Sequence, residues 1–146
     1  MKDMTVDPEV ALLKALAEPT RLRLAILLAL NGETCVCKLA EALDAPQFRV
    51  SRHLGVLRSC GFVEARREGT WMHYRLAPAA TPFAACLQDC FRACLADHET
   101  VAGDIARLAA APAPRAEFTP SSGATPNGYQ FPQTESPLPL HGQFLP

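Results

Sequence analysis

The sequence of 146 residues predicts a mainly α-helical fold that includes one β-hairpin. Apolar residues recur at helical spacing in several short segments before residue 60. The segment 62–76 is instead rich in β-branched and aromatic residues around a Gly-containing turn, which is typical of a hairpin. Most of the thirteen prolines lie from residue 112 onward. We therefore expect one folded domain over residues 1–111 and a disordered, Pro-rich tail over residues 112–146.

Caps and helix breakers predict the first two helices. Asp7 precedes a first-turn proline, and apolar residues at helical spacing then predict a helix over 8–17. A proline after that helix ends it, and Thr20 is expected to cap a second helix over 21–30. Gly32 is expected to close this second helix.

Two short helices separated by a tight turn follow, over 36–43 and 46–60. The second of them carries an apolar stripe at helical spacing and ends before Gly61. After the hairpin at 62–76, an alanine-rich segment predicts one long fifth helix over 83–110. Two short helices with a tight turn, followed by a hairpin, predict a winged helix-turn-helix.

The charge of the chain is unevenly distributed. The formal net charge is −1, but residues 45–76 hold six arginines against two glutamates. A local excess of positive charge on a near-neutral chain is typical of a small nucleic-acid reader. The amino terminus has mixed charge and no long apolar run, and six cysteines in a chain without a leader indicate reduced thiols. We expect a cytoplasmic protein that does not bind a membrane.

Polar side chains beside the apolar stripe of helix 46–60 are candidate DNA contacts. Side chains at the start of a recognition helix reach base edges in the major groove, and a hairpin lies along the phosphates. The alternative is a solvated polar helix face and a salt-bridged hairpin. The order of elements favours DNA contacts, for which the candidates are Gln47, Arg49, Ser51, Arg52 and His53 on the helix and Arg66, Arg67 and Arg75 on the hairpin.

Cys35 and Cys37 stand at the start of helix 36–43. Thiolates bind soft ions, and the N-terminus of a helix lowers the pKa of a thiol. Residues i and i+2 do not share a helix face, so binding one ion through both thiols is expected to distort the first turn. The alternative is that both are small buried apolar residues. Two thiols at one helix start favour the ligand role.

Four segments resemble the ArsR/SmtB family of metalloregulatory repressors: 16–22, 35–39, 50–58 and 69–76, within about residues 11–76. The resemblance implies a homodimer joined through the first and last helices, double-stranded operator DNA as the partner, and no enzymatic activity. It also implies that DNA is released when an effector binds. The pair Cys35 and Cys37 resembles the arsenic-responsive branch, in which the thiols ligate As(III) or Sb(III) and no organic cofactor is needed.

The chain departs from that pattern at two positions. Ala40 stands where a further Cys is often found, so the third ligand is open. Pro46 replaces the Ser that commonly opens the recognition helix, and Asp44 is expected to compensate as a cap.

Other cysteines offer candidate ligands. Cys86, Cys90 and Cys94 recur every four residues on one helix face, where they either pack or supply an additional ligand. Cys60 is expected to pack as a small residue. Asp97, His98 and Asp104 are too few to build a tetrahedral zinc site. A thiol-redox or sulfide-responsive repressor of the same fold is the alternative function, whereas no Cys-x-x-Cys motif supports a thiol oxidoreductase.

Overall fold

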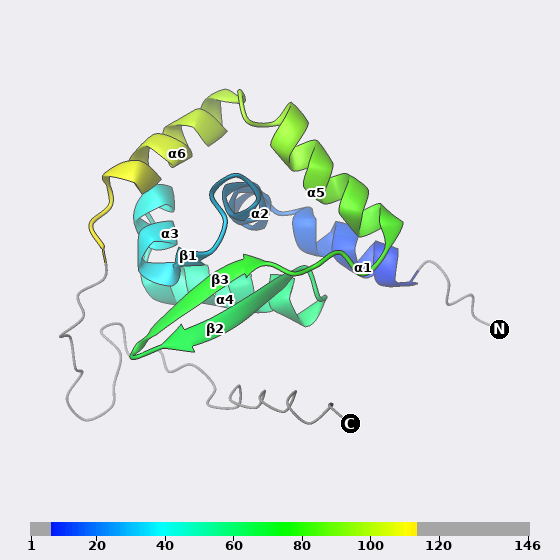
Figure 1. Ribbon diagram of the computed structural model, residues 1–146, viewed down its shortest axis with the longest axis horizontal. Coiled ribbons are helices and arrows are strands. Elements are labelled where there is room, and N and C mark those ends of the chain that lie inside the picture. The colour runs from blue at the N-terminus through cyan, green and yellow to red at the C-terminus, as the bar shows by residue number, and fades with distance from the viewer. Residues whose placement is uncertain (1–6, 114–146) are drawn as a thin grey trace.

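The computed structural model describes residues 7–113 (Figure 1). Its elements, in chain order, are α1 (Asp7–Leu16), α2 (Pro19–Asn31), β1 (Thr34–Cys35), α3 (Val36–Leu43), α4 (Gln47–Ser59), β2 (Val63–Glu68), β3 (Trp71–Leu76), α5 (Pro82–Cys94) and α6 (Glu99–Ala110). Helices α3 and α4 followed by the β2–β3 hairpin form the predicted winged helix-turn-helix. The tail predicted from residue 112 lies outside the described residues from position 114 onward.

The junction of α1 and α2 differs in detail from the prediction. Glu18, not Thr20, is the N-cap of α2, and its carboxylate accepts a hydrogen bond from the backbone N–H of Arg21 at 2.8 Å. Pro19 occupies the first turn of α2, where its missing N–H costs nothing. Gly32 closes α2 as expected, with a φ of 82°.

The turn between α3 and α4 is built by Asp44. This residue adopts the left-handed conformation (φ 53°) and ends α3, while its backbone N–H bonds to the carbonyl groups of Ala40 and Glu41. It therefore does not cap α4, contrary to the prediction. The N-cap of α4 is Pro46, which makes no side-chain capping bond. The first turn of α4 thus keeps backbone N–H groups that no cap satisfies.

The hairpin gains a short third strand that the sequence did not predict. Strand β1 pairs antiparallel with β3 and gives the sheet order β1–β3–β2. A two-residue strand carries no periodicity of its own, so only the pairing with β3 reveals it. The turn of the hairpin begins at Gly69, whose φ of 64° is a conformation that favours glycine.

The predicted fifth helix over 83–110 is two helices. Thr81 caps α5 and His98 caps α6, and the chain bends between Cys94 and Glu99. The bend lets the two apolar faces pack on different partners: α5 lies against α2, and α6 lies against α2 and α3 (Figure 1). Helical spacing alone could not distinguish one long helix from two.

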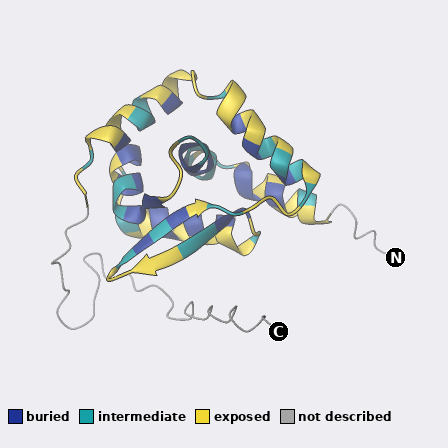
Figure 2. Cartoon of the chain, in the orientation of Figure 1, coloured by how far each residue is buried: buried dark blue, intermediate teal, exposed yellow. Residues whose placement is uncertain are grey.

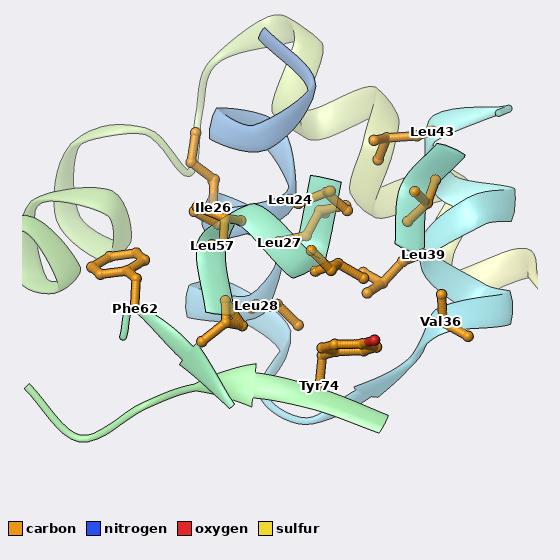
Figure 3. Close-up of a cluster of buried hydrophobic side chains, with 14 of the residues drawn as sticks. Leu24, Ile26, Leu27, Leu28, Val36, Leu39, Leu43, Leu57, Phe62 and Tyr74 are labelled. Atoms are coloured by element: carbon orange, nitrogen blue, oxygen red, sulfur yellow. The ribbon is translucent and has the colours of Figure 1, made fainter. Parts of the chain in front are cut away.

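The core surrounds α2, which lies at the centre of the fold and is buried from Leu24 to Leu28 (Figure 2). Leu24, Leu27 and Leu28 of α2 meet Leu57 of α4 and Tyr74 of β3 (Figure 3). Each fully buried leucine contributes about 1.5–3 kcal/mol. None of the helices between residues 7 and 113 combines the length and apolar content that a membrane-spanning helix needs.

Candidate thiol site and nucleic-acid interface

The two thiols at the start of α3 lie side by side. Cys35 is the N-cap of α3 in an extended conformation (φ −70°, ψ 144°), so its side chain folds back over the first turn. Its Sγ accepts the backbone N–H of Cys37 at 3.3 Å and lies 2.6 Å from the Sγ of Cys37. The two side chains therefore do not face apart, because Cys35 stands outside the helix, where the i and i+2 spacing does not separate them. A distortion of the first turn on ion binding stays a prediction.

The pair holds one easily ionised thiol. The hydrogen bond from the Cys37 thiol lowers the pKa of Cys35 to about 7, and backbone hydrogen bonds from Cys37 and Lys38 support the thiolate. The same bond, together with burial, raises the pKa of Cys37. Cys35 is 3% exposed and Cys37 is half-buried. Near neutral pH the site therefore combines a thiolate with a neighbouring thiol, which is a good nucleophile and soft-ion ligand.

The thiol site is continuous with the wing, the β2–β3 hairpin. Cys35 lies in β1 opposite His73 of β3, and Thr34 lies opposite Tyr74. Just before β1, the carboxylate of Glu33 accepts two hydrogen bonds from Arg66 of β2, at 2.8 and 3.2 Å. This guanidinium lowers the pKa of Glu33. Cys35 and its neighbour Glu33 are thus both in contact with the wing.

The remaining cysteines are apart from this pair. Cys86, Cys90 and Cys94 are all exposed on α5, and α2 lies between α5 and α3 (Figure 1). A hydrogen bond that the Cys90 thiol donates to Cys94 raises the pKa of Cys90, so these two thiols are neighbours. Cys60 packs partly against the core as predicted, and its thiol donates to the carbonyl of Leu57 at 3.3 Å.

Nowhere in residues 7–113 do three or more His, Cys, Asp or Glu side chains gather in an arrangement suited to a metal ion. Asp104, weighed for zinc in the sequence, is fully buried and accepts hydrogen bonds from Arg23 and Arg107 at 2.6–2.9 Å. Arg107 also donates to the carbonyl of Ala42 at 2.7 Å. Asp104 therefore connects α6 to α2, and Arg107 connects α6 to α3.

Helix α4 presents part of the predicted DNA-contact set to solvent. Arg49 and Arg52 are exposed, and Gln47 is half-buried. Ser51 is a correction: it is 3% exposed and its Oγ has no hydrogen-bond partner, so it faces the protein interior with the core residues of α4. His53 is half-buried, with Nδ1 3.5 Å from Arg21 Nη1 and 3.8 Å from Glu18 Oε1, and so links α4 to the start of α2.

The predicted wing arginines are exposed, and the hairpin carries ion pairs. Arg66 pairs with Glu33 and Glu68, and Arg75 pairs with Glu64 at 2.7 Å. The salt-bridged hairpin weighed in the sequence is thus present. Arg67 lies exposed on β2.

The sequence missed three features: strand β1, the attachment of α6 to α3, and exposed Phe48 at the start of α4. The first two depend on contacts between distant segments. The sequence could have revealed Phe48, because it is an apolar residue that does not share the helix face of Val50 and Leu54.

A winged helix-turn-helix with a basic, exposed recognition helix and a thiol pair beside its wing defines a DNA-binding regulator. Residues 18–65 match the family described as "Bacterial regulatory protein, arsR family". The chain is 46% identical over 80 residues to the "Arsenical resistance operon repressor" of Escherichia coli K12, covering 55% of this chain and 68% of that protein. It is 45% identical over 78 residues to the "Arsenic resistance transcriptional regulator ArsR1" of Pseudomonas putida KT2440, covering 53% of this chain and 59% of that protein.

The fold is similar to a solution structure from Mycobacterium bovis. That structure is the homodimeric winged helix-turn-helix DNA-binding domain Mb0332, a possible ArsR-family transcriptional regulator, with 37% identity and a TM-score of 0.51. The match covers 64% of this chain and 87% of that one. The chain belongs to the ArsR family of bacterial regulatory proteins, and it is a transcriptional repressor of that family and not an enzyme.

Proposed function

We propose that this chain forms a dimeric repressor that binds operator DNA and releases it when trivalent arsenic or antimony binds Cys35 and Cys37. The observation that carries the proposal is the pair of Sγ atoms 2.6 Å apart, one with a pKa of about 7. The names of the Escherichia coli and Pseudomonas putida relatives support arsenic as the element concerned.

The proposed binding step is a ligand exchange without electron transfer. Arsenous acid carries three hydroxyl groups, and each sulfur that binds replaces one of them. The Cys35 thiolate displaces a hydroxide, which takes a proton from solvent and leaves as water. The Cys37 thiol gives its own proton to the second departing hydroxyl. Two As–S bonds form, two As–O bonds break, and one As–OH group remains for exchange with a third ligand.

The contacts of Cys35 suggest how binding reaches the DNA-contacting elements. Sulfur bound to arsenic is a weaker acceptor than a thiolate, so the capping bond from the N–H of Cys37 weakens. Cys35 is also paired with His73, and its neighbour Glu33 is held by Arg66. The wing and α3 are therefore the parts that shift relative to α4.

The dimer proposal now rests on α1 and α5. Val10 and Leu13 of α1 are 41% and 49% exposed, which is costly for apolar side chains without a partner. The final helix, α6, already buries Val101 and Leu108 against its own chain. Helix α5 also buries Ala84, Gln88 and Phe91, but its other face presents exposed cysteines, so α5 is the half that we assign to the second subunit. If Cys86, Cys90 or Cys94 supplies a third thiolate, it comes from α5 of the other subunit.

The proposed DNA interface comprises α4 and the wing. Within the described part of the chain, Arg49 and Arg52 form no salt bridge, so their charges are available to bases and phosphates. Gln47, and His53 if it leaves its contacts with α2, complete the helix set. Arg66, Arg67 and Arg75 of the wing contact phosphates, and Arg66 and Arg75 give up ion pairs with glutamates to do so.

Operator release titrated with arsenite tests the effector site. Cys35→Ser and Cys37→Ser are each expected to keep operator affinity, because neither thiol lies on α4, and to lose release by arsenite. Cys60→Ser is the matched control and is expected to respond like the wild type. Release of either single variant at the wild-type arsenite concentration would place the effector site elsewhere.

A thiol-redox or sulfide-responsive repressor is the second candidate, because adjacent sulfurs with a thiolate also suit oxidation. Titration of the same complex with a disulfide or polysulfide separates the two. Release by the oxidant that a reductant reverses, with no response to arsenite, would favour this candidate.

A further inference from the structure

One face of α4 is exposed along its whole length. Phe48, Arg52, Gly55 and Ser59 follow one another at spacings of three or four residues, so they line one side of the helix. The opposite side carries Val50, Ser51, Leu54 and Leu57, all of which are buried. The exposed side is therefore the surface that α4 offers to a partner.

Phe48 is the unusual member of this face. It is 36% exposed in the first turn of α4 and is not among the described residues that pack against the core. Its neighbours Arg49 and Arg52 are exposed and make no ion pair within residues 7–113. An aromatic ring beside two available guanidinium groups suits a partner that is anionic and also offers an apolar contact.

Duplex DNA offers both kinds of contact in its major groove. The phosphates and the guanine edge attract arginine, and the 5-methyl group of thymine is the apolar feature of the groove. The first turn of a recognition helix is the part that reaches base edges. We propose that Phe48 reads a thymine by contact with its 5-methyl group and so sets part of the operator sequence. This inference rests on the proposed DNA binding by α4.

Replacement of thymine by deoxyuridine tests the contact, because it removes only the methyl group. A duplex is first selected from a random pool by the wild-type protein, and each thymine is then replaced in turn. At one position in each half-site, wild-type affinity is expected to fall about fourfold, which corresponds to the loss of one buried methyl group. Phe48→Ala is expected to bind the unmodified duplex about fourfold more weakly or worse and to lose all sensitivity to that replacement.

Two further variants make the test specific. Val56→Ala removes a comparably exposed apolar side chain (38%) near the other end of α4, and it is expected to keep the full deoxyuridine effect. Phe48→Leu retains an apolar side chain and is expected to show part of the deoxyuridine effect. The proposal is overturned if no deoxyuridine position weakens wild-type binding, or if Phe48→Ala retains the wild-type sensitivity. Failure of the wild type to select any duplex would instead overturn the proposed DNA binding itself.

A role in folding or assembly has a different outcome. If Phe48 packs against a second subunit, Phe48→Ala lowers the melting temperature or dissociates the dimer, while affinity per dimer and the deoxyuridine effect stay as in the wild type. Light scattering and thermal unfolding of the same samples detect this result, which would also overturn the proposal.

Discussion

Replacing Cys37 by alanine should change the ionisation of Cys35. The hydrogen bond from the Cys37 thiol is the largest influence that brings the pKa of Cys35 to about 7. Alanine removes that donor and leaves the weaker influences, which are the backbone N–H groups of residues 37 and 38 and the charge of Lys38. We therefore expect the pKa of Cys35 to rise toward the ordinary thiol value of about 8.5 in Cys37→Ala.

The expected change at neutral pH is large. With a pKa of about 7, Cys35 is about half thiolate at pH 7, whereas with a pKa of about 8.5 it is only about 3% thiolate. Because the pKa of Cys35 is about 7, its thiolate is present above pH 7 and becomes protonated as the pH falls through 7. Arsenite-dependent release of DNA is accordingly expected to weaken below pH 7 in the wild type, and to weaken from a higher pH in Cys37→Ala.

Ultraviolet absorbance of the thiolate measures this ionisation at equilibrium and needs no access to the buried sulfur. The background variant carries Ser at the other four cysteines: Cys60, Cys86, Cys90 and Cys94. In that background, one thiolate is expected to form with a midpoint near 7. Cys37→Ser, which keeps a hydroxyl donor, is expected to have a midpoint between those of the parent and of Cys37→Ala.

Two results would refute the reasoning. A parent midpoint near about 8.5 would mean that the two sulfurs do not share a hydrogen bond in solution. Equal midpoints in the parent and Cys37→Ala would mean that backbone N–H groups alone set the pKa. Cys35→Ser is the control for assignment, because it should abolish the thiolate that forms near pH 7.

Three further predictions concern stability. Asp104→Asn should lower the free energy of unfolding by about 2–3 kcal/mol, because the buried side chain loses the charge that pairs with Arg23 and Arg107. A change below about 0.5 kcal/mol in urea unfolding would contradict this. Gly55→Ala should raise stability by about 0.5–1 kcal/mol, since nothing lies within 4 Å of the added Cβ, and a lower melting temperature would show that the site is occupied. Truncation after Ala111 should leave the melting temperature unchanged, because a Pro-rich segment buries little apolar surface, and a drop of several degrees would show that the tail docks on the domain.

Local sequence rules predicted the DNA-binding architecture well. The apolar spacing of α3 and α4, the end of α4 before Gly61 and the turn at Gly69 are decided by residues a few positions apart, so the winged helix-turn-helix could be derived without tertiary contacts. The break near residue 95 could not, because both halves of the segment have helical spacing. Only the different partners of α5 and α6 decide it.

The candidate site, too, was determined partly by the sequence and partly by the tertiary structure. The sequence by itself determined that Cys35 and Cys37 stand at the start of a helix, since the apolar pattern of 36–43 fixes where that helix begins. Only the tertiary structure decided that the two sulfurs meet, because it places Cys35 outside α3 in a strand that pairs with His73, a residue far along the chain. The burial of Ser51 and the exposure of Phe48 were likewise decided by how α4 packs on the core. Spacing along a helix gives its faces, but packing against distant segments chooses which face is buried.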